Sequence, residues 1–121
     1  MKKDETIQNY LEAIYFVSQE KEKVRAIDIC RYLGFSRPTV SVALKQLEVD
    51  NYITIDRNNI QLAKKGKNIA KTMSERHEYI AKILMSLGVS KKTAYKDSCL
   101  VEHDLSDESF NAIKKATKKI S

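Results

Sequence analysis

The sequence has 121 residues, a formal net charge of +6, and hydrophobic and charged fractions of 42% and 31%. This length predicts one compact fold, or two small subdomains sharing a core, and leaves little room for a separate catalytic domain. No stretch approaches the ~18 unbroken apolar residues that a membrane helix needs. The N-terminus also lacks the apolar core of a signal peptide, so we expect a cytoplasmic protein.

The excess of 22 Lys and Arg over 16 Asp and Glu fits a nucleic-acid binder, because cationic side chains release the counterions of phosphates. The same lysines also suit solvated helix faces. Two cysteines, Cys30 and Cys99, are too few for a disulfide framework. Cys30 lies beside Ile29 and near Leu33, so we interpret it as core filler.

Apolar residues at helical spacing predict an amphipathic helix over residues 4–20. A short second helix is expected to end at Gly34, where glycine suits a helix C-terminus. Ser36 is the expected N-cap of a third helix, with Pro38 in its first turn. The inward stripe of that helix is expected to be Val40, Leu44 and Leu47.

Residues 52–62 change to a period typical of strands, which predicts a β-hairpin with a turn over residues 56–59. A long helix is expected just beyond Gly66, over about residues 67–87, and Gly88 should stop it. Ser90 is expected to open a helix over residues 90–104, and Ser106 to open a last one. The long helix should carry an apolar stripe of Ile69, Met73, Ile80, Leu84 and Leu87, and the last helix carries Phe110, Ile113 and Ile120.

The order of helix, short turn, capped helix and hairpin predicts a winged helix-turn-helix in a mostly α-helical chain. The start of the third helix carries small polar residues that permit close approach to base edges, and Arg37 suits a guanine or a phosphate. Lys45 is expected to reach phosphate farther along, and the hairpin tip suits DNA backbone or minor groove. The expected DNA-contacting residues are Ser36, Arg37, Pro38, Thr39, Ser41, Lys45 and Arg57.

His77 lies on the apolar stripe of the long helix, where a lone histidine is more often a satisfied core residue. Cys99, Glu102 and His103 follow at helical spacing on neighbouring faces, and thiolate, carboxylate and imidazole can together bind a borderline divalent metal. Asn9 and Glu12 share one side of the first helix. A metal held by these helices would bias the geometry of the DNA-reading half. The alternative is a helix that carries these residues by chance.

The chain resembles the diphtheria toxin repressor and manganese transport regulator (DtxR/MntR) family over essentially its whole length. The resemblance rests on residues 9–15, 36–41, 65–67, 76–78 and 99–106. It implies the two-domain form without an SH3-like domain, metal-dependent operator binding, and repression of metal-uptake genes. It further implies a DNA-binding domain at 1–66, a helical metal-binding and dimerisation domain at 67–121, and a homodimer.

Carried over by position, the resemblance implies the metal ligands Asn9, Glu12, His77, Cys99, Glu102 and His103. The manganese-type branch has glutamate where this chain has Cys99, and Asn9 matches neither branch. The ancillary site of the iron-type branch is interrupted by Ala81 and Tyr95. We therefore expect Fe²⁺ to be preferred over Mn²⁺, with Co²⁺ and Zn²⁺ as further candidates, and one ion to bind better than a second.

Three alternatives remain open at this stage. A metal-independent winged-helix transcriptional regulator with a decayed metal site would explain the departures at Asn9 and Cys99. An enzyme using Cys99 as nucleophile and His103 as base is disfavoured, because no oxyanion loop or glycine-rich cradle accompanies the pair. A protein-interaction module would differ from both by lacking salt-dependent DNA binding.

Overall fold

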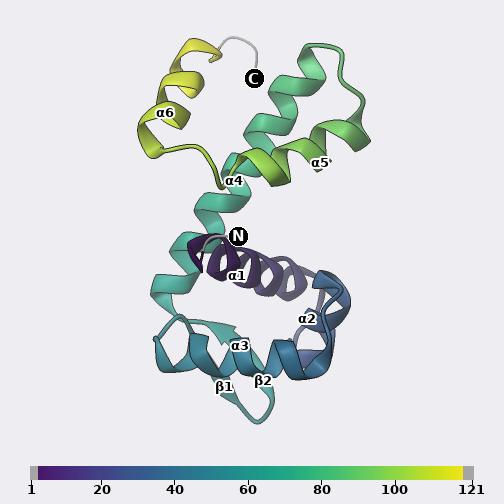
Figure 1. Cartoon of the computed structure of the whole chain (residues 1–121), viewed down its shortest axis with the longest axis vertical. Coiled ribbons are helices and arrows are strands. Elements are labelled where there is room, and N and C mark those ends of the chain that lie inside the picture. Colours follow the sequence, from purple (N-terminus) through teal and green to yellow (C-terminus); the bar gives the residue numbers. More distant parts are fainter. Residues whose placement is uncertain (1–2, 119–121) are drawn as a thin grey trace. The chain divides into compact units, whose positions relative to one another are not determined.

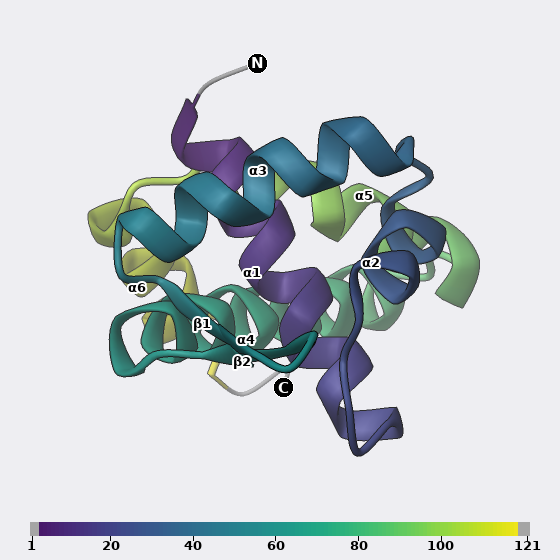
Figure 2. The same ribbon diagram turned by 90° about the horizontal axis from the view of Figure 1, so that it is seen from below.

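The computed structural model describes residues 3–118 and is mostly α-helical with one small hairpin, as expected (Figures 1 and 2). Within that range the elements in chain order are α1 (Lys3–Glu20), α2 (Ala26–Leu33), α3 (Arg37–Val49), β1 (Ile53–Asp56), β2 (Asn59–Leu62), α4 (Lys64–Ser86), α5 (Lys91–Val101) and α6 (Asp107–Ala116). The chain forms two compact units, residues 1–71 and 72–121, and the boundary falls inside α4. None of the described helices is long and apolar enough to cross a membrane.

The turn between α2 and α3 is built as the sequence predicts. Gly34 has a φ of 74°, and its amide donates to the Cys30 carbonyl, which ends α2 in a left-handed residue. Ser36 then caps α3, where its hydroxyl accepts from the Thr39 amide. Pro38 occupies the first turn of α3, where no intrahelical donor is lost.

The start of α2 is fixed by a polar contact that the sequence analysis missed. The Asp28 carboxylate accepts from the Arg25 amide at 2.9 Å and pairs with the Lys21 ammonium at 2.6 Å. These two contacts lower the pKa of Asp28, the Lys21 hydrogen bond more than the Arg25 amide. The loop between α1 and α2 is therefore tied to the first turn of α2.

The hairpin has a tighter turn than expected. Asp56 pairs with Asn59 in the antiparallel register, so the turn is only Arg57-Asn58, with φ values of 52° and 65°. The predicted turn over 56–59 is therefore wrong at its outer residues. A two-residue turn with both φ values positive matches the right-handed twist of paired strands.

The first unit has a continuous apolar core to which α1, α2, α3 and the hairpin all contribute. Val40, Leu44 and Leu47 are buried as expected, and Cys30 is buried among them as core filler. The other buried members of this cluster are Tyr10, Leu11, Ala13, Ile14, Val17, Val24, Ile29, Ile53, Ile60 and Ala70. This packing joins α3 and the hairpin to α1 and α2 through one apolar core.

The helix α4 begins at Lys64, three residues before the expected start, so Gly66 lies inside its first turn. A Cβ at Gly66 would lie 2.2 Å from the Tyr52 carbonyl oxygen, so the glycine permits a close backbone approach rather than a break. At its C-terminal end, α4 stops at Ser86, and Gly88 follows with a φ of 98°. Leu87 lies beyond the helix and is 70% exposed, so the predicted apolar stripe of the long helix was wrong at Leu87.

In the second unit, α5 ends at Val101 rather than at the expected residue 104. Glu102 is its C-cap, and His103 lies in the turn that follows. Ser90 and Ser106 cap α5 and α6 as expected, each accepting from the amide three residues on. Phe110 is buried, whereas Ile113 is exposed, and the expected role of Ile120 lies outside the described residues.

Candidate functional site

Side chains from α4 and from the end of α5 converge on one nitrogen of His77. Its Nδ1 lies 3.1 Å from the Ser98 hydroxyl, 3.3 Å from the Cys99 sulfur and 3.3 Å from a Glu102 carboxylate oxygen. The other Glu102 oxygen lies 3.2 Å from Nε2 of His103. Four of the expected ligands, His77, Cys99, Glu102 and His103, therefore form one cluster in the second unit.

The cluster combines deep burial with one accessible side. Glu102 is fully buried and the His103 side chain is only 3% exposed, whereas Cys99 is exposed. Hydrogen bonds that the His77 imidazole donates, to Cys99 first and to Glu102 second, raise the pKa of His77 to about 10, against an opposing effect of burial. Two imidazoles, a carboxylate and a thiol, linked in series by these contacts, provide the mixed N, O and S donors that suit a borderline divalent metal.

The sequence analysis missed Ser98, which is fully buried and contacts His77. Its hydroxyl also donates to the Tyr95 carbonyl at 3.0 Å. A signal was available, because Ala94, Ser98 and Glu102 recur every four residues and mark the buried face of α5. Such partners orient the ring of a metal-binding histidine.

The two remaining expected ligands, Asn9 and Glu12, belong to the first unit, one helical turn apart on α1. Their assignment stays a prediction that rests on the family resemblance. The sequence analysis expects Ala81 and Tyr95 to interrupt the ancillary metal site of the iron-type branch. Ala81 offers no donor atom. The Tyr95 hydroxyl donates to a Glu78 carboxylate oxygen at 2.8 Å, which raises the pKa of the tyrosine.

All seven expected DNA-contacting residues are exposed. Six of them follow one another from the N-cap of α3 along its first turns, and Arg57 is at the hairpin tip. The Ser36 hydroxyl is engaged in capping, since it also donates to the Thr39 hydroxyl at 2.9 Å. Ser36 thus shapes the start of α3 in addition to any contact with DNA.

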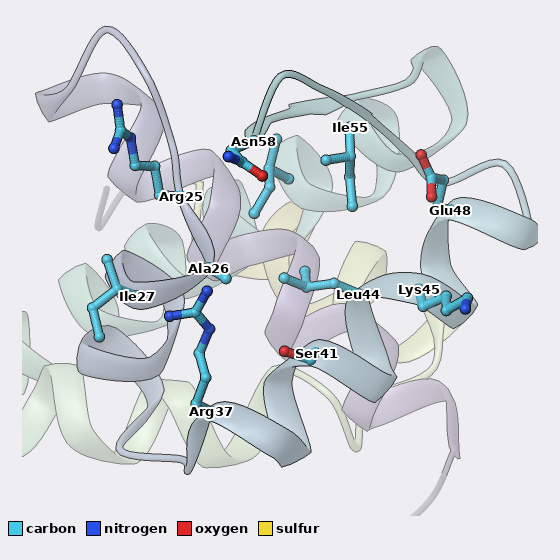
Figure 3. A pocket seen from close by; sticks show the side chains of 11 residues that line it. Arg25, Ala26, Ile27, Arg37, Ser41, Leu44, Lys45, Glu48, Ile55 and Asn58 are labelled. Carbon is cyan, nitrogen blue, oxygen red and sulfur yellow. The ribbon is translucent and has the colours of Figure 1, made fainter.

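A groove of about 490 Å³ lies between α2, α3 and the hairpin (Figure 3). Arg37 extends from the start of α3 toward the beginning of α2, and Ser41 and Lys45 follow along the same helix. Asn58 of the predicted hairpin tip also lines the groove, as does Arg25, which the sequence analysis missed because no periodic pattern marks it. The basic side chains Arg25, Arg37 and Lys45 make this groove suitable for a phosphate backbone, with Glu48 as its single acidic lining residue among those described.

Comparison with known proteins agrees with both halves of this description. Residues 4–58 match the family described as "Iron dependent repressor, N-terminal DNA binding domain", and residues 63–121 match "Iron dependent repressor, metal binding and dimerisation domain". The transcriptional regulator MntR of Escherichia coli O6:H1 is 34% identical over 116 residues, which are 95% of this chain and 75% of that protein. MntR of Bacillus subtilis is 31% identical over 109 residues, which are 89% of this chain and 77% of that protein.

Among solved structures, that of the manganese regulator SloR superposes with a TM-score of 0.80 at 26% identity. The match covers 93% of this chain but 53% of the SloR chain, so this chain spans about half the length of that protein. The relatives are transcriptional regulators, which places the chain among non-enzymatic DNA-binding proteins. The chain therefore belongs to the DtxR/MntR family of metal-dependent, DNA-binding transcriptional repressors.

Proposed function

We propose that this chain represses metal-homeostasis genes by binding operator DNA as a homodimer when a divalent metal is held by His77, Cys99, Glu102 and His103. Asn9 and Glu12 complete the proposed ligand set, on the basis of the family resemblance. The observation that carries the proposal is the convergence of Cys99 and the buried Glu102 on one nitrogen of His77. Binding of a divalent metal supplies free energy that favours the folded arrangement of its donors.

The proposal divides the chain into a DNA-binding domain over residues 1–66 and a metal-binding and dimerisation domain over residues 67–121. The match to a family of dimerising repressors supports the homodimer, and sedimentation of the purified chain tests it. The cytoplasmic location expected from the sequence is kept as part of the proposal. It follows from a role at operator DNA.

We further propose that Fe²⁺ binds more tightly than Mn²⁺, and that a second ion binds weakly. The relatives named above are manganese regulators by name, but the Cys99 thiol favours softer ions than a glutamate would. The uncharged Asn9 also supplies less attraction for a hard cation than an aspartate would. Titration calorimetry under anaerobic reducing conditions tests the order, and tighter Mn²⁺ binding would contradict it.

A double variant tests whether positions 9 and 99 set this metal preference. Asn9→Asp with Cys99→Glu restores the donors that the resemblance associates with the manganese-type branch. We expect the double variant to gain Mn²⁺ affinity relative to Fe²⁺ by at least tenfold. An unchanged ratio of the two affinities would show that these positions do not set the preference.

The DNA-binding part of the proposal rests on the basic groove beside α3. Arg37→Ala is expected to weaken operator binding and to reduce its salt dependence, because each phosphate contact contributes a slope of about 0.9 in log K against log salt. The same variant should bind metal as the parent chain does. Loss of metal affinity in Arg37→Ala would contradict this division of labour.

The decisive experiment is a mobility shift on the DNA upstream of the gene itself, first with chelator and then with each divalent metal. We expect binding only with metal, and Glu102→Ala or His103→Ala should abolish the response while leaving a folded dimer. Glu75→Ala, which removes an exposed carboxylate from α4, is the control and should respond as the parent does. Binding that ignores both chelator and metal would establish the alternative of a metal-independent regulator with a decayed site.

A further inference from the structure

A buried arginine, Arg76, directly precedes His77 and lies beside the cluster of proposed ligand side chains. Arg76 is 4% exposed, and its Nη1 donates to the carbonyl oxygens of Glu102 at 3.3 Å and Leu105 at 2.8 Å. Its Nη2 pairs with the Asp107 carboxylate, and the guanidinium lies over the Phe110 ring, 4.8 Å from its centroid. One side chain of α4 thus contacts the end of α5, the following turn and the start of α6.

The backbone that Arg76 contacts is the segment that carries two of the proposed ligands. Since α5 ends at Val101, the carbonyl groups of residues 102–105 lie at or beyond the helix C-terminus, where helices leave acceptors without intrahelical donors. A guanidinium offers five donors in a rigid planar fork and keeps its charge when buried. It can therefore bind two carbonyl groups and a carboxylate at once.

We propose that Arg76 is a positioning residue for the proposed metal site, holding the turn over residues 102–105 so that the Glu102 carboxylate lies between His77 and His103. The inference rests on the proposed metal site. Because Arg76 and His77 are consecutive on α4, one helix presents the His77 imidazole and fixes the backbone of its partner Glu102, which is followed directly by His103. Any shift of that turn relative to α4 would move Glu102 away from Nδ1 of His77, now 3.3 Å distant.

The test compares Arg76→Gln and Arg76→Lys with the parent chain, using Co²⁺ alone as the probe under anaerobic reducing conditions. Affinity comes from titration, and coordination from the visible absorption bands and the sulfur-to-cobalt charge-transfer band. Loss of an outer partner of metal ligands typically weakens binding 10–100-fold. We expect that loss for Arg76→Gln, a smaller loss for Arg76→Lys, and altered cobalt bands in both, since an ammonium cannot span all three acceptors.

Phe110→Leu is the control for general destabilisation, because it removes the buried ring beneath the guanidinium and leaves its hydrogen bonds in place. We expect Phe110→Leu to lower the melting temperature without metal while keeping Co²⁺ affinity within twofold and the bands unchanged. Equal affinity losses in Phe110→Leu and Arg76→Gln would overturn the inference, since destabilisation alone would then suffice.

Different results would overturn the proposed metal site and the proposed role of Arg76. A parent chain that binds no Co²⁺ would overturn the proposed metal site and, with it, the role of Arg76. A parent chain that binds Co²⁺, together with Arg76→Lys and Arg76→Gln variants of the same affinity and spectrum, would overturn only the role of Arg76. If Arg76→Gln does not fold, the Arg76→Lys spectrum decides, because that variant keeps the charge and the contact with Phe110.

Discussion

The hairpin tip carries a backbone conformation that its sequence does not favour. Arg57 has a φ of 52°, in the left-handed region where a residue with a Cβ costs about 1–2 kcal/mol. The conformation is imposed by its surroundings, since the Val24 amide donates to the Asn59 side chain at 3.1 Å and the Ile60 amide donates to the Val24 carbonyl at 2.8 Å. These contacts fix the strands, and the two-residue turn must close between them.

Arg57→Asn is therefore expected to stabilise the fold while weakening DNA binding. Asparagine tolerates the left-handed region, so relief of about 0.5–1 kcal/mol should raise the melting temperature by roughly 2–4 °C. If each Arg57 contacts one phosphate, its loss lowers the salt slope by about 0.9 per protomer, which corresponds to about tenfold weaker binding per wing in 0.1 M salt. A dimer that uses both wings should lose about a hundredfold.

Thermal melts followed by circular dichroism and operator titrations at several salt concentrations measure the two effects on the same protein. Lys96→Asn removes the same charge from an exposed position on α5 and should change neither the melting temperature nor the salt slope by a comparable amount. A lower melting temperature for Arg57→Asn would refute the strain argument. An unchanged salt slope would refute the phosphate contact.

Three further predictions address the site and the fold. Since Cys99 and Glu102 raise the pKa of His77 to about 10, the imidazole carries a proton at neutral pH without metal, and metal binding must release it. Affinity should therefore rise by at least about tenfold per pH unit between pH 6.5 and 7.5, and titrations in buffers of different ionisation enthalpy should show the proton release. Gly66→Ala would place a Cβ 2.2 Å from a backbone oxygen and should cost about 1–3 kcal/mol in chemical denaturation, where the exposed Asn68→Ala should be near neutral. Ser36→Ala should cost about 1 kcal/mol through loss of the α3 cap, and an unchanged denaturation midpoint would argue against that cap.

The first unit could be read largely from its sequence because local signals and the core agree there. Gly34, Ser36 and Pro38 specify the turn and the start of α3 through backbone preferences that need no tertiary information. The errors in the predicted helix bounds arose where contacts between distant residues decide the local conformation. The long helix was expected to begin after Gly66, but it begins at Lys64, and glycine is needed at position 66 because the Tyr52 carbonyl lies too close for a Cβ.

The candidate site could be predicted only in part. The spacing of Cys99, Glu102 and His103 indicated a donor set, but the end of α5 was misplaced because no glycine or proline marks it. The four-residue spacing could mark Ser98 as buried, but the contacts of Ser98 with His77 and of Arg76 with Glu102 join residues more than 20 apart in the sequence. Long-range contacts of this kind leave no periodic signature in a single sequence.

The second unit departs from ordinary core composition in a way that ties its stability to its function. Among its described residues, the buried apolar side chains are few, and two of them are alanines; they are Met73, Ile80, Ala81, Ala94 and Phe110. Nearly as many buried polar residues accompany them, namely Arg76, His77, Ser98 and Glu102. Each such group costs free energy on burial unless it is bonded, so the packing of this unit depends on satisfying a polar network rather than on apolar area. Under the proposed function, a cation held by the carboxylate and imidazoles would complete this polar network, so metal binding and the stability of the second unit would be coupled.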